Sequence, residues 1–164
     1  MKLLYCKEKK NENNFNCSFF DIVEFKPSLK GLYLNDEPHN FKTTVVRICF
    51  QLMTFGSAKL VCAVSNNGET MHTSYVVPRC FKFNFLSTED YIIGPCYTAP
   101  DYRGQGIYPN ILDYITTKIG TENTVFYMCV DENNFSSIRG IEKSGFKKIG
   151  TAKKSRFLKR YYIG

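Results

Sequence analysis

The chain has 164 residues, of which 43% are apolar and 23% charged, and these values are ordinary for one globular domain that can bury a large core. The formal net charge is +7, which fits either a solvated basic surface or an anionic partner such as a nucleotide, a phosphate or a nucleic acid. No apolar run reaches about 18 residues and no signal-peptide core follows Met1, so neither a membrane span nor a secretory leader is expected, and the cytoplasm is the predicted location.

Much of the positive charge is concentrated toward the C-terminus, in a group that we call the basic tail. It comprises Lys147, Lys148, Lys153, Lys154, Arg156, Lys159 and Arg160. The aromatic residues are spread through strand-like runs and are not interleaved with this group, which disfavours a nucleic-acid-binding module.

Seven cysteines are present, and none forms a Cys-x-x-Cys pair. Their odd number and the position of several inside apolar runs indicate reduced, mostly buried thiols. Cysteine and histidine do not cluster at short spacing, so no metal site is predicted.

The first half of the chain carries the weaker structural signals. Residues 11–16 are polar and predict a loop, and the loose alternation over Phe19–Phe25 predicts a strand. Turns should dominate Pro27–Asn40, because this segment holds Gly31, Asn35, Pro38 and His39. The apolar run Thr43–Phe55 fits a strand or a short helix equally, because its periodicity does not separate the two.

A hairpin and a third strand follow. Lys59–Val64 and Thr73–Val77 are β-rich runs joined through Asn66-Asn67-Gly68, whose residue types tolerate the positive φ of a tight turn. Tyr91–Thr98 predicts another strand, made irregular near its middle by Gly94-Pro95, because Gly often marks a bulge and Pro cannot donate to a ladder.

Two helices are predicted in the last third of the chain. Apolar residues recur every three to four positions over Gly106–Ile119, and Gly120 is placed to end that helix. Asn134–Lys143 predicts a second helix, with Ile138 and Ile141 facing inward and Gly145 as its stop.

The remaining runs are strands. Thr124–Val130 is a β-rich run that we expect to be buried on both faces, and Phe146–Ile149 and Arg156–Ile163 complete the chain. Strands that alternate with helices in this order predict an α/β fold of the α+β type, with helices flanking a mixed sheet.

A glycine-rich turn between a strand and a helix predicts an anion site. Free backbone N–H groups and the helix dipole favour negative charge there, and glycines let the backbone approach a phosphate closely. Gly104 and Gly106 supply this turn, and Arg103 adds a cation able to make bidentate contacts. The segment lacks the ending of a P-loop and the third glycine of a dinucleotide fingerprint.

Two segments together carry a family resemblance. Thr98–Ile107, read Thr-Ala-Pro-Asp-Tyr-Arg-Gly-Gln-Gly-Ile, resembles the Arg/Gln-x-x-Gly-x-Gly/Ala motif with which the GNAT superfamily of N-acetyltransferases binds acetyl-CoA. Asn134–Phe146, with its Glu-Lys-Ser-Gly-Phe ending, resembles the helix that closes the GNAT core. The resemblance covers about residues 59–163 of a single domain over 1–164; residues 1–58 are unmatched and are expected to shape the acceptor side.

The resemblance implies a mixed, mostly antiparallel sheet, a bulged strand before the pyrophosphate-binding helix, and acetyl-CoA as co-substrate without a metal. The implied coenzyme-binding residues are Cys96, Tyr97, Thr98, Arg103, Gly104, Gln105, Gly106, Ile107, Tyr108, Asn134 and Ser137. The turn and Tyr108 would hold the pyrophosphate. Residues 96–98 would pair with the pantetheine like an added strand and aim an N–H at the thioester carbonyl, and Asn134, supported by Ser137, would contact the pantetheine.

Two positions depart from the family pattern. Tyr108, followed by Pro109, replaces the last Gly or Ala of the first motif and is expected to reshape the pyrophosphate pocket. Ile141 stands where many GNAT enzymes carry a tyrosine that protonates the leaving thiolate, so another Tyr, a Cys or solvent must serve.

Direct transfer to an amine needs a base, and histidine suits that task best. His72 is the candidate base, because it lies on the strand expected beside the thioester-binding strand, and a structural role is its alternative. His39 and Asp90 are weaker candidates, with Glu89 beside Asp90. Cys96 is placed for a nucleophile, although a buried strand cysteine is usually inert.

The acceptor is open between several classes. The run Tyr102–Pro109 resembles a GNAT subgroup that acts on surface-polysaccharide sugars, which favours a nucleotide-linked amino sugar, and the basic tail would meet that anion or the 3′-phosphate of coenzyme A. The alternatives are a protein, a peptide or a small amine, or a non-catalytic coenzyme-A-binding module. The Phe-rich run Phe81–Phe85 fits an exposed edge that supports a homodimer, or a strand facing the core.

Overall fold

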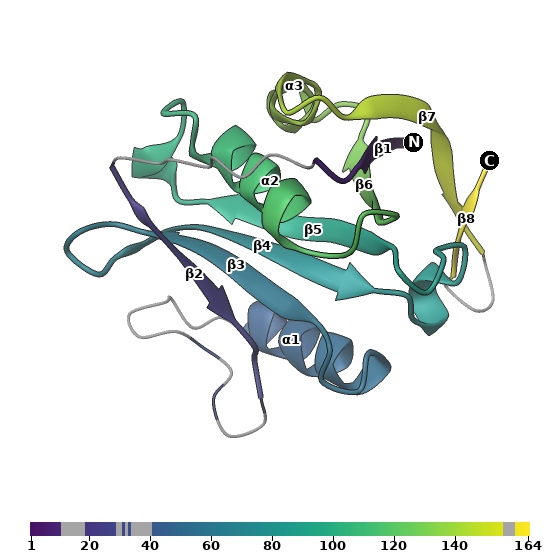
Figure 1. The fold of residues 1–164 in the computed structure, drawn as a ribbon, viewed down its shortest axis with the longest axis horizontal. Coiled ribbons are helices and arrows are strands. Elements are labelled where there is room, and N and C mark those ends of the chain that lie inside the picture. The colour runs from purple at the N-terminus through teal and green to yellow at the C-terminus, as the bar shows by residue number, and fades with distance from the viewer. Residues whose placement is uncertain (11–18, 29–30, 32, 34–40, 156–159) are drawn as a thin grey trace.

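The computed structural model describes residues 1–10, 19–28, 31, 33, 41–155 and 160–164 (Figure 1). One sheet of eight strands runs in the order β2-β3-β4-β5-β6-β1-β7-β8. The strands are β1 (Lys2–Glu8), β2 (Asp21–Phe25), β3 (Lys59–Val64), β4 (Thr70–Pro78), β5 (Tyr91–Thr98), β6 (Val125–Asp131), β7 (Lys147–Lys154) and β8 (Tyr161–Ile163). The helices are α1 (Phe41–Met53), α2 (Ile107–Lys118) and α3 (Phe135–Lys143), with 3-10 turns η1 (Phe81–Phe83) and η2 (Pro100–Tyr102).

The sheet is mixed and mostly antiparallel, as the family resemblance implies. Among the described strands only β5 and β6 run parallel, and every other neighbouring pair is antiparallel. Helix α2 connects these two parallel strands, because a parallel pair needs a crossover. In the part of the chain that the structure describes, no helix combines the length and the apolarity that a membrane span requires.

Helices cover both faces of the sheet, with α1 on one face and α2 and α3 on the other (Figure 1). Strand β3 shows the division, since Val61 and Ala63 pack in the cluster beneath α2 while Leu60 and Cys62 pack in the cluster beneath α1. Because both faces are covered, all four of these side chains are fully buried.

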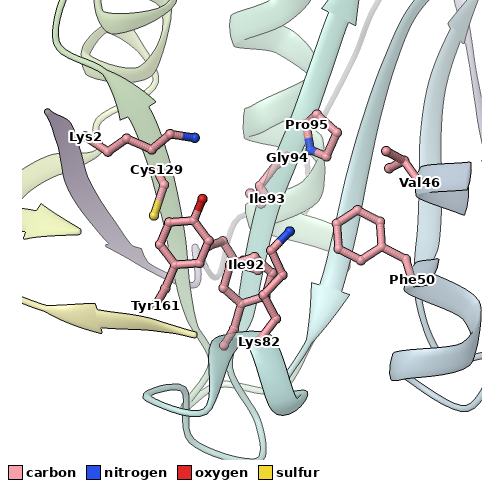
Figure 2. A pocket seen from close by; sticks show the side chains of 11 residues that line it. Lys2, Val46, Phe50, Lys82, Ile92, Ile93, Gly94, Pro95, Cys129 and Tyr161 are labelled. Atoms are coloured by element: carbon pink, nitrogen blue, oxygen red, sulfur yellow. The ribbon is translucent and has the colours of Figure 1, made fainter. Parts of the chain in front are cut away.

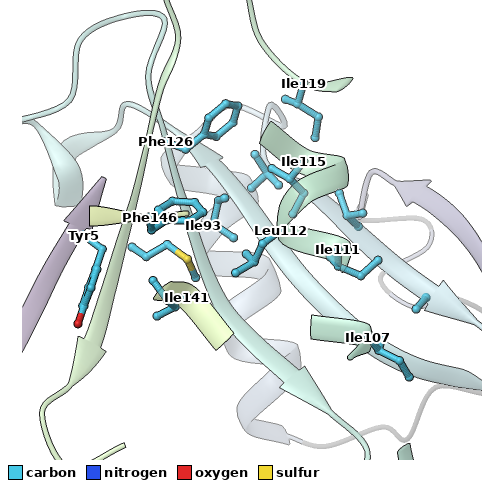
Figure 3. Packing of buried hydrophobic residues seen from close by; sticks show 14 of the residues in the cluster. Tyr5, Ile93, Ile107, Ile111, Leu112, Ile115, Ile119, Phe126, Ile141 and Phe146 are labelled. Carbon is cyan, nitrogen blue, oxygen red and sulfur yellow. The ribbon is translucent and has the colours of Figure 1, made fainter. Parts of the chain in front are cut away.

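Helix α2 is anchored by one apolar stripe that faces the sheet (Figure 3). Ile107, Ile111, Leu112 and Ile115 are at most 1% exposed, and each contributes about 1.5–3 kcal/mol of burial free energy. Gly120, at φ +80°, follows the helix as predicted.

Strand β1 is absent from the sequence-based prediction. It lies between β6 and β7 and pairs antiparallel with both. Leu3 and Tyr5 are buried under α2 and α3, and Leu4 is buried on the other face, so the strand lacks the alternation that marks a half-exposed strand.

Several other expectations are corrected or settled. Thr43–Phe55 is largely helix, because it forms α1. The Phe81–Phe85 run begins with the 3-10 turn η1 and forms no strand edge for dimer pairing. Strand β6 is fully buried on the face of Phe126, Met128 and Val130 only, and its other face is half-buried. The predicted loop at 11–16 and most of the turns of 27–40 lie outside the described residues, as do residues 156–159 of the last predicted strand.

Strand β5 is irregular at the predicted place, and this opens the sheet. Gly94 has φ +125°, and the register with β4 shifts between Ser74 and Val76. Strand β5 pairs with β6 only from Tyr91 to Ile93, whereas Cys96–Thr98 pair with β4 alone among the described strands. One backbone edge of the last part of β5 is therefore left without a strand partner.

Candidate active site

A cleft of about 880 Å³ lies between the end of β5, the N-terminal turn of α2 and one face of α3. It brings together two segments that are distant in sequence, the glycine-rich turn and the start of α3. Of the sequence-predicted residues, the lining includes His72, Cys96, Tyr97, Thr98, Arg103, Gly104, Gly106, Ile107, Tyr108, Asn134 and Ser137. Its volume falls within the range typical of small-molecule sites.

The glycine-rich turn presents backbone donors to this cleft. Gly104 and Gly106 both have φ +78°, and a Cβ atom at either position would meet nothing within 4 Å. Gly106 is the N-cap of α2 and supplies no side-chain cap to the N–H groups of Ile107 and Tyr108, two residues that line the cleft. This arrangement favours an anion at the helix N-terminus.

Two side-chain hydrogen bonds stabilise the turn. Arg103 Nε donates to the carbonyl oxygen of Thr98 at 3.1 Å, and Gln105 Nε2 donates to that of Asp101 at 3.0 Å. Gln105 does not line the cleft, so its observed contact is within the turn.

Helix α3 forms the opposite wall. Asn134 caps it, because its Oδ1 accepts the N–H of Ser137 at 3.2 Å and the hydroxyl of Ser136 at 3.1 Å. Arg139 and Lys143 also line the cleft, although the sequence-based prediction did not include them. Their spacing of four from each other, and of three and seven from Ser136, places all three on one helical face, and this is the signal that could have found them.

The cleft is strongly basic. Its lining holds Arg103, Arg139 and Lys143 and contains no Asp or Glu. Exposed cations at the mouth of a cleft raise the local concentration of an anionic ligand, and Arg can bind phosphate in a bidentate manner. These cations come from the glycine-rich turn before α2 and from α3. None of the described residues of the basic tail lines the cleft.

A buried polar chain runs from the cleft wall into the protein. His72 Nδ1 is hydrogen-bonded with Thr98 Oγ1 at 2.7 Å, and its Nε2 with Ser74 Oγ at 2.7 Å. The thiol of Cys96 lies near the side chains of Ser74 and Tyr108, and both act to lower its pKa. The ring centroids of His72 and Tyr108 lie 5.5 Å apart.

Burial determines the protonation state of His72, Cys96 and Tyr108. It lowers the pKa of His72 to about 3, since the ring is 1% exposed and no carboxylate partner compensates. It raises the pKa of Cys96 to about 11 and also raises the pKa of Tyr108. At neutral pH all three side chains are uncharged. An imidazole with a pKa of about 3 and both nitrogens hydrogen-bonded is a weak base, and a protonated thiol is a weak nucleophile.

Tyr108 is accommodated by a glycine on the facing helix. A Cβ atom at Gly140 would lie 2.6 Å from Cδ1 of Tyr108, which is closer than side chains pack. Glycine inside a helix costs about 1 kcal/mol relative to alanine, so Gly140 is explained by the room it leaves for the Tyr108 ring.

Solved structures show what this architecture is similar to. An acetyltransferase of the GNAT family from Colwellia psychrerythraea superposes with a TM-score of 0.60 at 16% identity, over 90% of this chain and 52% of its own. An acetyltransferase from Acinetobacter baylyi ADP1 gives a TM-score of 0.55 at 17% identity, over 87% of this chain and 88% of its own. A tandem GNAT protein from the clavulanic acid biosynthesis pathway gives a TM-score of 0.56 at 13% identity, over 90% of this chain and 50% of its own.

The chain has the GNAT fold. It spans about half the length of the Colwellia protein and of the tandem protein, and most of the Acinetobacter protein. No protein-family profile and no curated protein matches its sequence.

Within the GNAT fold the other predicted residues take different places. Asp90 lies at the far end of β5 from the cleft, where its buried carboxylate accepts the N–H groups of Ser87 at 2.9 Å and Val125 at 3.1 Å. Ile141 is 1% exposed in the core and does not line the cleft. His39 lies outside the described residues.

Proposed function

We propose that the protein is an acyl-CoA-dependent N-acyltransferase that transfers acetyl from acetyl-CoA to an amine by direct attack in a ternary complex. The observation that carries this proposal is the cleft itself. An uncapped helix N-terminus, an unpaired strand edge and three cations without a carboxylate line one cavity on a GNAT fold. These features match the pyrophosphate, the peptide-like pantetheine arm and the negative charge of coenzyme A in turn.

Each wall of the cleft has a proposed role. The N–H groups of the turn from Gly104 to Tyr108 hold the pyrophosphate, since the N–H of Arg103 already donates to the carbonyl oxygen of Pro100 at 3.2 Å. The free edge of β5 at Cys96–Thr98 pairs with the pantetheine. Asn134 and Ser137 meet the pantetheine from α3. Arg139 and Lys143 attract the remaining phosphate charge.

The proposed proton transfers follow from the uncharged state of the His72, Cys96 and Tyr108 side chains. The amine attacks the thioester carbonyl carbon, the C–N bond forms as the C–S bond breaks, and the thiolate leaves with the electron pair. The amine proton passes to solvent, because the pKa of His72 is too low to hold it at neutral pH. Tyr108 is our candidate donor of a hydrogen bond or proton to the thiolate, because its hydroxyl adjoins Cys96 in the cleft wall.

For the acceptor we propose the amino group of a nucleotide-linked amino sugar in cytoplasmic surface-polysaccharide biosynthesis. The support is the likeness of Tyr102–Pro109 to a GNAT subgroup that acts on such sugars. The six described cysteines are free thiols, which agrees with a reducing compartment.

Calorimetric titration with coenzyme A tests the cofactor half of the proposal. Wild type should bind, and Arg139→Met should weaken binding by roughly tenfold, because a charged contact to phosphate is lost. Lys148→Met removes an exposed charge that does not line the cleft and should leave the affinity unchanged. Absence of binding, or equal losses in both variants, would overturn the assignment of the cleft.

Mass spectrometry of acetyl-CoA incubations tests the acceptor half. Nucleotide-linked amino sugars should gain one acetyl group. Turnover of peptides alone would move the acceptor to proteins, and coenzyme binding without turnover of any amine would make the chain a binding module.

A further inference from the structure

A second cavity lies on the opposite face of the sheet from the coenzyme cleft, beneath α1 (Figure 2). Its volume is about 290 Å³, at the small end of the range for ligand sites. Its walls include Gly94 and Pro95 of β5, Cys129 of β6, and Tyr161 of β8.

The two cavities approach the same break in the sheet. The cleft ends on Cys96, and the second cavity ends on Gly94 and Pro95, which directly precede it. Strands β5 and β6 part after the pair Ile93 and Met128. A group held in the second cavity therefore lies across this opening from a group held along Cys96–Thr98.

The second cavity is positively charged. The ammonium groups of Lys2, Lys82 and Lys154 lie 5.8, 5.9 and 5.9 Å from the ring centre of Tyr161. Lys2 and Lys82 line the cavity, and Figure 2 shows both side chains directed into it. The ammonium of Lys82 is also 5.3 Å from the ring centres of Phe50 and Phe83.

No carboxylate balances these charges in the described part of the chain. None of the three lysines has an ion pair there, and the cavity lining holds no Asp or Glu. Asp131 is the cross-strand neighbour of Lys2, but its Oδ1 accepts the N–H of Asn133 and it forms no ion pair with Lys2. Aromatic faces attract each ammonium but carry no net charge, so the repulsion between the lysines persists.

We propose that this cavity binds the acceptor and selects an amine that carries an anionic group, phosphate or carboxylate, which Lys82 and Lys2 hold while the amine points to the opening at Gly94. This inference rests on the proposed function, because it takes the thioester to lie along Cys96–Thr98. Because Lys82 and Gly94 line the same small cavity, the anion should stand within a few bonds of the amine, and the rest of a larger acceptor, such as the nucleotide of a nucleotide-linked sugar, would extend outside it.

The environment of Lys82 agrees with an anionic ligand. Burial, followed by the positive charge of Lys154, lowers the pKa of Lys82. A bound anion would replace the lost hydration and offset the repulsion, so binding should raise that pKa again.

Binding is tested without any turnover. In protein with isotope-labelled lysine, the side-chain NMR signal of Lys82, assigned from its loss in Lys82→Met, should shift on titration with inorganic phosphate or acetate. The signal of Lys153 should not move, because Lys153 neighbours Lys154 on β7 but alternation places it on the other face. A stationary Lys82 signal with both anions would overturn the proposal.

Selectivity is tested with matched amines. Glucosamine 6-phosphate and glucosamine differ by a phosphate, and glycine and methylamine differ by a carboxylate. The anionic member of at least one pair should be acetylated with the higher kcat/KM, and Lys82→Met should remove roughly tenfold to a hundredfold of that preference. Lys153→Met is the matched control and should preserve it.

The two hypotheses fail differently. Loss of coenzyme A binding by wild type would remove the proposed function, whatever Lys82 does. Normal coenzyme A binding, with equal turnover of charged and neutral amines or with equal effects of Lys82→Met and Lys153→Met, would overturn the anionic acceptor alone. Which pair responds distinguishes a phosphate from a carboxylate.

Discussion

Lowering the pH from about 7.5 to about 5 should destabilise the wild-type protein by about 2 kcal/mol more than it destabilises a His72→Gln variant. His72 is 1% exposed, and burial lowers its pKa from 6.5 to about 3. Below its ordinary pKa the unfolded chain binds a proton at this residue that the folded protein does not bind. The stabilisation is therefore present above the ordinary pKa and is lost as the pH falls.

The magnitude follows from the distance to the ordinary pKa. At about pH 5 the unfolded state lies about 1.5 pH units below that value, which at about 1.4 kcal/mol per unit gives about 2 kcal/mol. The result depends little on the folded-state value, provided that value stays below about 4.

Urea unfolding at both pH values provides the assay. It is followed by circular dichroism, because the chain has no tryptophan. The variant loses hydrogen bonds to Thr98 and Ser74 and should be less stable at both pH values, so only the change with pH is compared. Other titrating groups cancel in that comparison. Equal pH-dependent losses in the two proteins would refute the buried, neutral state of His72.

Three further substitutions test the packing and the site. Gly140→Ala should destabilise the protein by about 1–2 kcal/mol because its Cβ meets Tyr108, and in a Tyr108→Ala background it should instead stabilise by up to about 1 kcal/mol; a double-mutant cycle in urea measures both. Asp90→Ala should cost about 2–3 kcal/mol in unfolding free energy, because two N–H groups lose their acceptor, while calorimetry shows unchanged coenzyme A affinity. Gly106→Ala should weaken coenzyme A binding at least about tenfold, because φ +78° strains any residue with a Cβ; an unchanged dissociation constant would contradict the role of the turn.

Some residues of the candidate site could be predicted from local sequence, whereas others become recognisable only in the folded structure. The turn at Gly104 and Gly106 could be read from sequence, because the positive φ and the open space in front of it depend on the local residue types. Arg139 and Lys143 were missed, because their helical face becomes significant only when α3 stands opposite that turn. The sequence predicts that the basic tail meets the anion, yet none of its described residues lines the cleft, whose cations are Arg103, Arg139 and Lys143.

The sequence by itself determined the elements whose signals are local. The β3–β4 hairpin, both ends of α2 and α3, and the irregularity of β5 at Gly94-Pro95 follow from turn chemistry, apolar spacing and the restrictions of Gly and Pro. Only the tertiary structure decided the place of β1, because a strand buried on both faces has no alternation to mark it.

The tertiary structure also decided the protonation of His72 and the meeting of Lys2, Lys82 and Lys154 around Tyr161. A pKa depends on desolvation and neighbouring charge, and both are set by residues far away in the chain. His72 was a reasonable base by residue type and strand position. Burial between Thr98 and Ser74 lowers its pKa to about 3 and makes it a weak base, and no local pattern in the sequence contains that information.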